Sequence, residues 1–444
     1  MSQNKPTATV VGGGFAGVEC ARMLSRNNIR VILFEMKPVK FSKAHKSENL
    51  AELVCSNSFK ASRINSAAGL LKAEMELFGS VCVRAAKKSA VPAGGALAVD
   101  RDIFSELVTE EIENDENITV IRREATEIPT DADAVIIAAG PLCSDELATK
   151  VAGLCPGGTL SFYDAAAPIV SADSIDMTQA FSASRYDRGG EDDYINCPLD
   201  KETYESFYSE LINAETALVR DFDKGAVYEG CMPIEVLAGR GADAIRYGPM
   251  KPVGLIDPKT GHRPWAVVQL RKENTAGTLY NLVGFQTNLK FGEQKRVFSL
   301  IPALHNAQFV RYGVMHRNTF LNAPLLLNGD FSVKSNPSLF FAGQITGVEG
   351  YMESAASGIL AGVNAARRIF GRETLVLPDI TMLGALQSHI TNTQSRDYQP
   401  MGASFGLLPP LDERIKDKSE RYMRLAQRSL DYYKSAGIGE ITYE

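Results

Sequence analysis

Hydrophobic and polar positions in the first 36 residues form two short apolar runs with a helical repeat between them. The apolar runs at 8–11 and 31–34 are typical of buried parallel strands. The apolar spacing between the runs predicts a helix that continues through Leu24. The order strand, helix, strand predicts a βαβ unit in a parallel sheet.

The turn between the first strand and the helix has the pattern G-x-G-x-x-G, and it reads Gly12, Gly13, Gly14, Phe15, Ala16, Gly17. This spacing permits a tight turn, a close approach of the backbone to a pyrophosphate, and close packing of helix on strand. Glu35 ends the second strand, where it can accept hydrogen bonds from a ribose. The complete unit predicts a dinucleotide site; a plain glycine-rich turn is the alternative.

A second unit, at residues 338–367, favours FAD over NAD as the nucleotide. An apolar strand at 339–342 meets Gly343, and a helix rich in small residues follows from Ser354 to Arg367. Flavoproteins of the two-dinucleotide-fold type often end in this way, with the late strand beside the N-terminal sheet. A strand at 134–139 is predicted as a third member of that sheet. An ordinary βα unit is the alternative reading of the late segment.

The middle of the chain has a different pattern. Strands are expected near 119–121 and 125–128, but residues 161–324 contain aromatic and β-branched runs such as 265–270 and 279–285. The turn at 257–261 predicts a hairpin. An amphipathic helix is predicted over 200–221, and its inward residues are Tyr204, Phe207, Leu211 and Leu218.

These patterns predict an α/β fold class with two parts. Residues 1–160 and 325–444 are expected to form an FAD-binding, Rossmann-like domain with a helical tail from about 379. Residues 161–324 are expected to form an inserted α+β domain. A second complete G-x-G-x-x-G is missing, so a nicotinamide reductant is expected to bind transiently rather than on its own Rossmann fold.

Composition narrows the setting. The chain has 444 residues, 45% of them apolar, and no apolar run approaches the length of a membrane span. The first residues lack the apolar core of a signal peptide, so a cytoplasmic protein with no membrane partner is expected. Seven cysteines are scattered without a C-x-x-C pair. We therefore expect reduced thiols and no structural metal.

The net charge of −6 does not indicate a nucleic-acid partner, but the charge is uneven. Between Lys37 and Lys88 there are ten basic and four acidic residues, an excess of six, and residues 414–434 hold seven basic and three acidic ones. A local excess of this kind can form an RNA-binding surface, whereas a solvated surface of mixed charge is the alternative.

Two cysteines stand out by their context. Cys55 follows an apolar run and precedes the polar cluster Ser56-Asn57-Ser58, and Cys231 lies between Gly230 and Met232-Pro233. A cysteine at such a turn can be accessible, and backbone N–H groups can stabilise its thiolate. For any single cysteine the alternative is a small buried hydrophobe, which suits Cys20 and Cys82.

Long stretches of the chain closely resemble the bacterial folate- and FAD-dependent tRNA (uracil-5-)-methyltransferase family (the TrmFO family), flavoproteins related to MnmG/GidA. The resemblance covers essentially the whole chain, and the matching stretches include AELVCSNS (51–58), VPAGGALAVDR (91–101), YGPMKPVGLIDPKTG (247–261), LVGFQTNLKFGEQKRV (282–297) and GVEGYMESAASG (347–358). Departures from the family pattern are small. Phe59 stands where the family more often has leucine, and the glycine turn at 12–17 differs from the family's usual sequence only at positions other than the glycines that contact phosphate.

The resemblance implies methylation of uridine C5 in RNA, with U54 of the tRNA T loop as the expected target. It assigns Cys231 as the nucleophile that adds to uracil C6, with Cys55 assisting near the flavin. It also implies 5,10-methylenetetrahydrofolate as the carbon donor and NADH or NADPH as the reductant. His316 would stack on the folate and Tyr351 near the flavin ring; a structural histidine and a core tyrosine are the alternatives. The division of roles between the two cysteines stays open.

RNA is expected to dock on the basic segment at Lys43, Lys46 and Lys60, with a flipped uridine entering beside Cys55. A related branch methylates ribosomal RNA, so 23S rRNA is an alternative substrate. A wobble-uridine modifier is a rival, but such enzymes carry a large additional C-terminal helical domain. A non-catalytic RNA-binding flavoprotein is the third reading.

Overall fold

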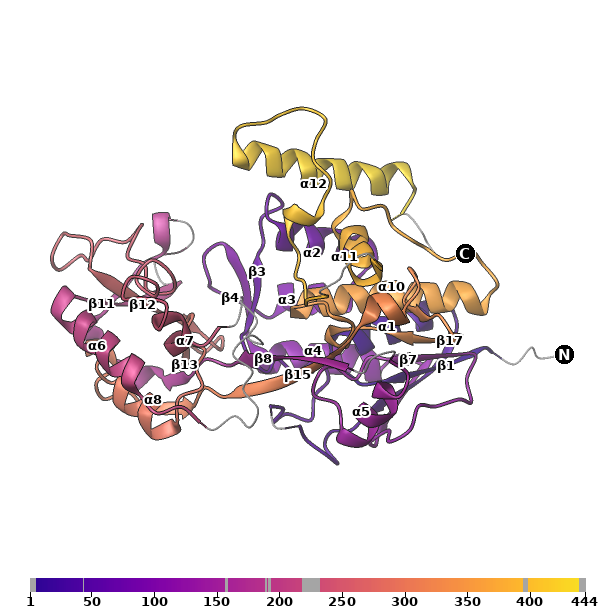
Figure 1. Ribbon diagram of the computed structural model, residues 1–444, viewed down its shortest axis with the longest axis horizontal. Coiled ribbons are helices and arrows are strands. Elements are labelled where there is room, and N and C mark those ends of the chain that lie inside the picture. The colour runs from indigo at the N-terminus through magenta and orange to yellow at the C-terminus, as the bar shows by residue number, and fades with distance from the viewer. Residues whose placement is uncertain are drawn as a thin grey trace.

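The computed structural model describes residues 5–42, 44–155, 159–187, 190, 193–217, 232–393 and 398–438. Within these residues the chain forms two bodies that lie side by side, joined by a pair of long strands (Figure 1). One hydrophobic core draws its residues from 8–155 and 320–433, and the other from 170–307. The domain boundaries near 160 and 325 stay predictions.

A six-stranded sheet organises the first body. Its spatial order is β16 (Ser332–Val333), β17 (Asn336–Phe341), β7 (Ala134–Ile137), β1 (Thr7–Val11), β2 (Arg30–Glu35) and β6 (Ile118–Arg122). All neighbours pair in parallel except β16, which runs antiparallel to β17. The central strands are buried apolar runs, as expected for a parallel sheet covered on both faces.

The described helices of the first body pack on this sheet or on one another. They are α1 (Phe15–Arg26), α2 (Ala67–Leu77), α3 (Val81–Lys88), α4 (Arg101–Glu113), α5 (Asp145–Ala152), α9 (Ala323–Leu326), α10 (Tyr351–Ile369), α11 (Met382–Thr391) and α12 (Lys418–Ser435). Helices α1 and α10 pack so closely that a Cβ on Gly358 would lie 2.1 Å from the Ala16 carbonyl oxygen. This close packing requires glycine at position 358, and it places the start of α10 beside the glycine turn.

The second body is built on an antiparallel sheet. Its order is β10 (Phe181–Ser182), β11 (Tyr194–Leu199), β12 (Ala266–Lys272), β13 (Leu279–Leu282), β9 (Ile169–Ser171) and β14 (Phe309–Arg311). Helices α6 (Lys201–Asn213), α7 (Ile234–Ala238) and α8 (Phe291–Phe298) pack on it. Phe285 lies at the centre, with its ring centroid 5.5 Å from that of Phe298 and 6.2 Å from that of Phe207.

Strands β8 (Thr159–Ala165) and β15 (Met315–Leu321) pair antiparallel and run between the two bodies (Figure 1). A small sheet of β3 (Ser58–Ala61), β5 (Ala96–Val99) and β4 (Ala90–Val91) lies beside this junction. The remaining elements are short 3-10 turns at Ala172–Ser174, Met177–Gln179, Arg185–Asp187, Pro302–Leu304, Gln344–Thr346 and Phe405–Leu407.

Most predicted elements of the first body are confirmed, with ends that move by one to three residues. The strand predicted at 125–128 is wrong: these residues form a loop, and the following Pro129 has no amide for a strand ladder. The predicted hairpin at 257–261 is also wrong. Its turn forms, with Gly261 N–H donating to the Asp257 carbonyl oxygen, but β12 pairs with β11 and β13 instead.

The helix predicted over 200–221 is shorter than expected. Helix α6 ends at Asn213 because Ala214 adopts an extended conformation and Thr216 then bridges to Leu289. Tyr204, Phe207 and Leu211 are buried as predicted. Leu218 lies outside the described residues.

Candidate active site

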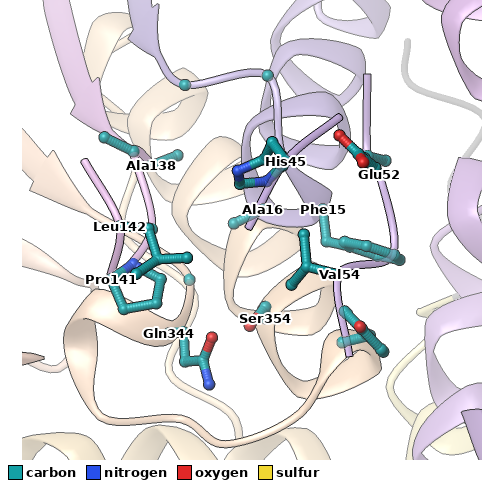
Figure 2. Close-up of a pocket in the computed structure, with 18 of the residues that line it drawn as sticks. Phe15, Ala16, His45, Glu52, Val54, Ala138, Pro141, Leu142, Gln344 and Ser354 are labelled. Carbon is teal, nitrogen blue, oxygen red and sulfur yellow. The ribbon is translucent and has the colours of Figure 1, made fainter. Parts of the chain in front are cut away.

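A cavity of about 450 Å³ opens where the glycine turn, the start of α10 and the middle of β15 meet. Figure 2 shows Phe15, Val54, Pro141, Leu142 and Gln344 arranged around this space. Its walls include Gly12 to Ala16, Glu35, Cys55, Gly343 and Tyr351, all of which were predicted site residues. Residues as far apart in the sequence as Gly12 and Ser354 therefore line one cavity.

Gly12, Gly14 and Gly17 of the motif differ in what surrounds the position of a Cβ atom. Gly12 has a φ of +105°, and a Cβ there would lie 2.6 Å from the Ala138 carbonyl oxygen. A Cβ at Gly17 would lie 1.8 Å from the Gly12 carbonyl oxygen. A Cβ at Gly14 would meet no protein atom within 4 Å, and Gly14 lines the cavity. Only at Gly14 does the missing side chain leave room for a ligand.

The N-terminus of α1 faces this room. Gly14 caps the helix without a side-chain hydrogen bond, and its first turn carries no acidic residue. The free N–H groups and the positive end of the helix dipole are what a pyrophosphate requires. The residues present therefore fit the phosphates of a dinucleotide.

Glu35 holds the neighbouring wall of the cavity. Its Oε2 accepts from the Gly13 N–H at 2.8 Å and its Oε1 from the Lys37 N–H at 2.9 Å. The carboxylate is buried and lines the cavity, so it lies where a ribose hydroxyl can reach it. The position predicted for this acid at the end of β2 is confirmed.

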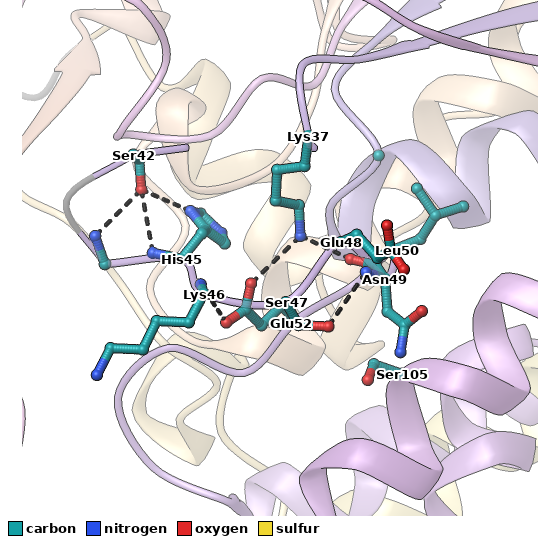
Figure 3. Close-up of polar contacts among 12 residues, drawn as sticks. Lys37, Ser42, His45, Lys46, Ser47, Glu48, Asn49, Leu50, Glu52 and Ser105 are labelled. Atoms are coloured by element: carbon teal, nitrogen blue, oxygen red, sulfur yellow. Dashed lines mark hydrogen bonds and ion pairs between the residues drawn. The ribbon is translucent and has the colours of Figure 1, made fainter. Parts of the chain in front are cut away.

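A polar loop contributes further residues to the cavity lining, and Figure 3 shows its hydrogen bonds and ion pair. The Glu52 carboxylate accepts from the Lys46 N–H at 2.8 Å and from Lys37 Nζ at 3.3 Å. Ser42 Oγ lies 2.6 Å from His45 Nδ1. His45, Lys37 and Glu52 all line the cavity. None of the three was predicted as a cavity residue, because their contacts depend on how the 42–52 loop folds back.

Tyr351 is the first residue of α10 and connects two features of the site. Its hydroxyl oxygen accepts from the Cys55 N–H at 2.8 Å and lies 3.1 Å from Cys55 Sγ. Its ring centroid is 4.8 Å from that of Phe15 and 5.9 Å from that of Phe59. Burial, with a smaller contribution from Cys55, raises the pKa of the phenol well above its usual value, so the hydroxyl stays neutral.

The cysteines divide by environment. Cys20, Cys82 and Cys197 are buried, and burial raises the pKa of each thiol, which confirms the prediction for the first two. Cys143 was not predicted as a site residue but lines the cavity, and burial raises its pKa to about 11. Cys55 is half-buried and also lines the cavity. None of the six described cysteines forms a disulfide.

Some predicted site residues cannot be placed in this geometry. Cys231 and Lys43 lie outside the described residues. His316 belongs to β15, where its backbone pairs with that of Asp164. Two positions further along β15, the buried Asn318 lines the cavity, as does Gln286 from the second body. Neither amide was predicted as a site residue.

The basic segment from Lys37 to Lys88 is less exposed than its composition indicates. Lys37 is buried, and the Nζ of buried Lys72 donates to the carbonyl oxygens of Phe59, Ala61 and Ala68. Several other basic residues form ion pairs, namely Lys40 with Glu124 and Glu146, Lys60 with Glu353, Arg84 with Glu111, and Lys87 with Glu76. The Lys46 side chain is exposed.

Within the described part of the chain, no helix has both the length and the apolar character needed to cross a membrane.

Comparison with known proteins places this site in a family. The family described as "Glucose inhibited division protein A" matches residues 7–373. The chain is 54% identical over 425 residues to the methylenetetrahydrofolate--tRNA-(uracil-5-)-methyltransferase TrmFO of Acetivibrio thermocellus, covering 96% of this chain and 97% of that one. It is 55% identical over 424 residues to the protein of the same name from Caldicellulosiruptor bescii, covering 95% and 97%.

Among solved structures, Aquifex aeolicus GidA in its form I crystal superposes with a TM-score of 0.70 at 18% identity. The match covers 99% of this chain and 77% of that one. At this identity the likeness concerns the fold, and it agrees with the predicted FAD-binding, Rossmann-like α/β class. Because the curated relatives match at more than half identity over nearly their full length, the chain belongs to the TrmFO family of methylenetetrahydrofolate--tRNA-(uracil-5-)-methyltransferases.

Proposed function

We propose that this protein methylates C5 of a uridine in tRNA in the cytoplasm, at U54 of the T loop. The carbon donor is 5,10-methylenetetrahydrofolate, and NADH or NADPH supplies the electrons through FAD. The observation that carries the proposal is one cavity that combines an open pyrophosphate cradle at Gly14 with a thiol, Cys55, held against Tyr351. Family membership adds the substrate class.

FAD, when bound, supplies the redox chemistry that turns a one-carbon unit at the methylene level into a methyl group. The Gly12–Gly17 turn holds its pyrophosphate, and Glu35 accepts from its ribose. Tyr351 and Phe15 lie at the start of their helices, where an aromatic ring can pack on the cofactor. Gly343, with a φ of +87°, allows the chain to turn closely past Ala16.

The chain's nucleophile is Cys231. Its thiolate adds to uracil C6, so that electron density moves to C5, which forms the new bond to the one-carbon unit. Loss of the C5 proton expels the carrier amine from the one-carbon unit and leaves an exocyclic methylene at C5. A hydride derived from the nicotinamide adds to this methylene, and departure of the Cys231 thiolate from C6 restores the 5,6 double bond. Cys55, beside the cavity, assists at the C5 proton or at the one-carbon unit.

His316 holds the folate. It lies on β15, the same strand that carries the cavity residue Asn318. Lys43, Lys46 and Lys60 contact the RNA backbone. Lys60 lines the cavity at its rim while paired with Glu353, and Lys46 is exposed on the loop beside it. A uridine in a folded loop has to leave its stack to enter, at a cost of a few kcal/mol.

Transfer of labelled carbon tests the proposal. Purified protein is incubated with NADH or NADPH, folate labelled at the methylene carbon, and RNA that lacks 5-methyluridine. Label in tRNA at U54 is the expected result. Label in 23S rRNA alone would replace the substrate by the ribosomal one. Tight RNA binding without label transfer would identify a non-catalytic RNA-binding flavoprotein.

His316→Ala gives the matched test of the folate assignment. It should weaken folate use while flavin content and reduction by the nicotinamide stay near wild type. His305→Ala is the control, since His305 lies on the second body with its Nδ1 3.3 Å from the Ser299 carbonyl oxygen. Folate saturation identical to wild type would make His316 a structural residue.

A further inference from the structure

Three arginines hold the segment that carries Cys55, and the proposed reaction assigns them no part. They are Arg101 of α4, Arg271 of β12 and Arg311 of β14. Arg101 donates to the carbonyl oxygens of Leu53 at 2.6 Å and Cys55 at 3.0 Å. Arg311 donates to the carbonyl oxygen of Val54. Three consecutive carbonyl groups before Ser56 are thus bound by guanidinium groups.

Arg271 binds the other half of the segment through side chains. Its Nε donates to Asn57 Oδ1 and its Nη2 to Ser56 Oγ, both at 2.9 Å. Asn57 is fully buried, and its Nδ2 donates to the carbonyl oxygens of Val99 and Lys272, again at 2.9 Å. Asn57 therefore joins β5 of the first body to β12 of the second, and Arg271 closes the connection.

Burial makes this arrangement demanding. Arg271 is 6% exposed, and burial lowers the pKa of its guanidinium from the ordinary value. Glu273, 3% exposed, forms an ion pair with Arg101. A buried charge is tolerated when its hydrogen bonds are satisfied, so the geometry of these bonds has little freedom. The Glu273 carboxylate also interacts electrostatically with Arg271 and Arg311, so the three guanidinium groups share one buried carboxylate.

We propose that Arg271 is a positioning residue that aims the Cys55 thiol into the cavity, so that this thiol is in place only while β12 of the second body is packed against residues 53–58. Arg271 touches neither the cavity nor a reacting atom; it acts through Ser56 and Asn57. The catalytic role of the positioned thiol rests on the proposed function, whereas the positioning of Cys55 by Arg271 is independent of it.

Amide hydrogen exchange in the flavin-loaded protein tests the placement directly. Arg271→Met should accelerate exchange in peptides covering 53–58 by about tenfold or more, because the segment loses its anchor. Arg271→Lys should behave nearly the same, since an ammonium group keeps the charge but not the two-pronged geometry. Ser56→Ala, a milder change, should give about threefold. Exchange at wild-type rates in all three variants would overturn the proposal.

Arg185→Met is the matched control. Arg185 donates to Gln269 Oε1 on the same strand β12 and to the Val253 carbonyl oxygen, so its contacts stay within the second body. It should leave exchange at 53–58 unchanged. Equal acceleration in this control would mean that the loss of any partly buried arginine from the second body loosens the segment, which would also overturn the proposal.

A reaction assay separates positioning from general stability. Arg271→Met should lower the methyl-transfer kcat about tenfold or more, while the folate KM stays within about twofold. Combining it with Ser56→Ala should cost no more than Arg271→Met alone, because both changes break the same connection. Fully additive effects would contradict the shared role. If the wild type transfers no methyl group to any RNA, the proposed function fails, yet the exchange comparison still decides the placement.

Discussion

The Cys55 N–H donates to the Tyr351 hydroxyl oxygen across 2.8 Å, and Cys55 Sγ lies 3.1 Å from the same oxygen. One phenol therefore binds both the backbone and the side chain of the thiol residue. Tyr351 also opens α10, whose glycines pack against α1 beside the phosphate cradle. Tyr351 thus couples the position of the Cys55 segment to the wall of the proposed flavin site.

Tyr351→Phe should weaken flavin binding without unfolding the protein. The ring keeps its packing on Phe15, but the Cys55 N–H loses its acceptor, a loss worth about 0.5–1.5 kcal/mol. We expect the flavin dissociation constant to rise about 3–10-fold. Titration of the apoprotein with FAD, followed by flavin fluorescence, measures it.

Two variants make this result specific. Cys55→Ala keeps the amide, so it should retain nearly wild-type flavin affinity while methyl transfer falls. Tyr204→Phe removes a hydroxyl that donates to the Ala242 carbonyl oxygen in the second body, and it should not affect flavin. A loss in Cys55→Ala as large as in Tyr351→Phe would assign the effect to the thiol instead of the amide.

Gly14→Val should fold and yet fail to retain flavin. A side chain at Gly14 meets no protein atom within 4 Å, so it costs the apoprotein little but fills the phosphate position. Gly17→Val is the contrasting change, because its Cβ would lie 1.8 Å from the Gly12 carbonyl oxygen and disturb the fold itself. Flavin content per folded protein, with circular dichroism as the check on folding, separates them. A yellow Gly14→Val protein would refute the assignment of the cradle.

The fold of the first body was predictable because its signals are local. Glycine spacing, apolar runs and the terminal acid Glu35 each constrain a few adjacent residues, and they combine in only one common way. The second body was less predictable: its strands pair over long separations, as β11 does with β12. The turn at 257–261 looked like a hairpin for this reason, since turn residues say nothing about which strands finally pair.

Within the site, motif residues were predictable and their supports were not. Gly14, Cys55 and Tyr351 carry recognisable sequence contexts or family strings. Arg271 follows the apolar run at 265–270, and no local pattern connects it with its partners Ser56 and Asn57, which lie more than 200 positions away. Likewise, the basic excess near Lys37 predicted an open RNA surface, whereas Lys37 itself is buried against Glu52.

Cys231→Ala should bind FAD and accept electrons from the nicotinamide but transfer no carbon to RNA. The thiolate is needed to activate uracil C5 by adding at C6. With RNA that contains 5-fluorouridine, the wild type should form a stable protein–RNA adduct visible by denaturing electrophoresis, and Cys231→Ala should form none. Cys55→Ala serves as the second arm. An adduct that persists in Cys231→Ala and is lost in Cys55→Ala would reverse the two roles.

Replacing Lys43, Lys46 and Lys60 together by glutamine should weaken RNA binding and flatten its salt dependence. Each phosphate contact contributes about 0.7–0.9 to the slope of log affinity against log salt, so the slope should fall by about two to three. Lys60→Gln also breaks the pair with Glu353, so flavin content must be checked. Lys87→Gln is the control, since Lys87 pairs with Glu76. An unchanged slope would favour the basic tail at 414–434 as the RNA surface.

Glu74 joins the C-terminal helix to the first body through a buried carboxylate. It accepts from the N–H groups of Met382 and Leu383 at the start of α11 and from the hydroxyls of Ser429 and Tyr433 on α12. Burial raises the pKa of this carboxyl from 4.5 to about 6, against the opposing effect of the four donors. The folded state therefore holds its proton more tightly than the unfolded state.

Glu74 should thus contribute stability that is fully present below about pH 4.5 and lost as the pH rises through about 6. Relative to a non-titrating Glu74→Gln protein, the wild type should lose about 1 kcal/mol of unfolding free energy between about pH 5 and 7.5. Urea unfolding followed by circular dichroism measures the difference. Glu76→Gln, an exposed change on the same helix, is the control for the loss of a carboxylate as such. A wild-type advantage that grows with pH would mean that the four donors outweigh burial and hold the Glu74 pKa below its usual value.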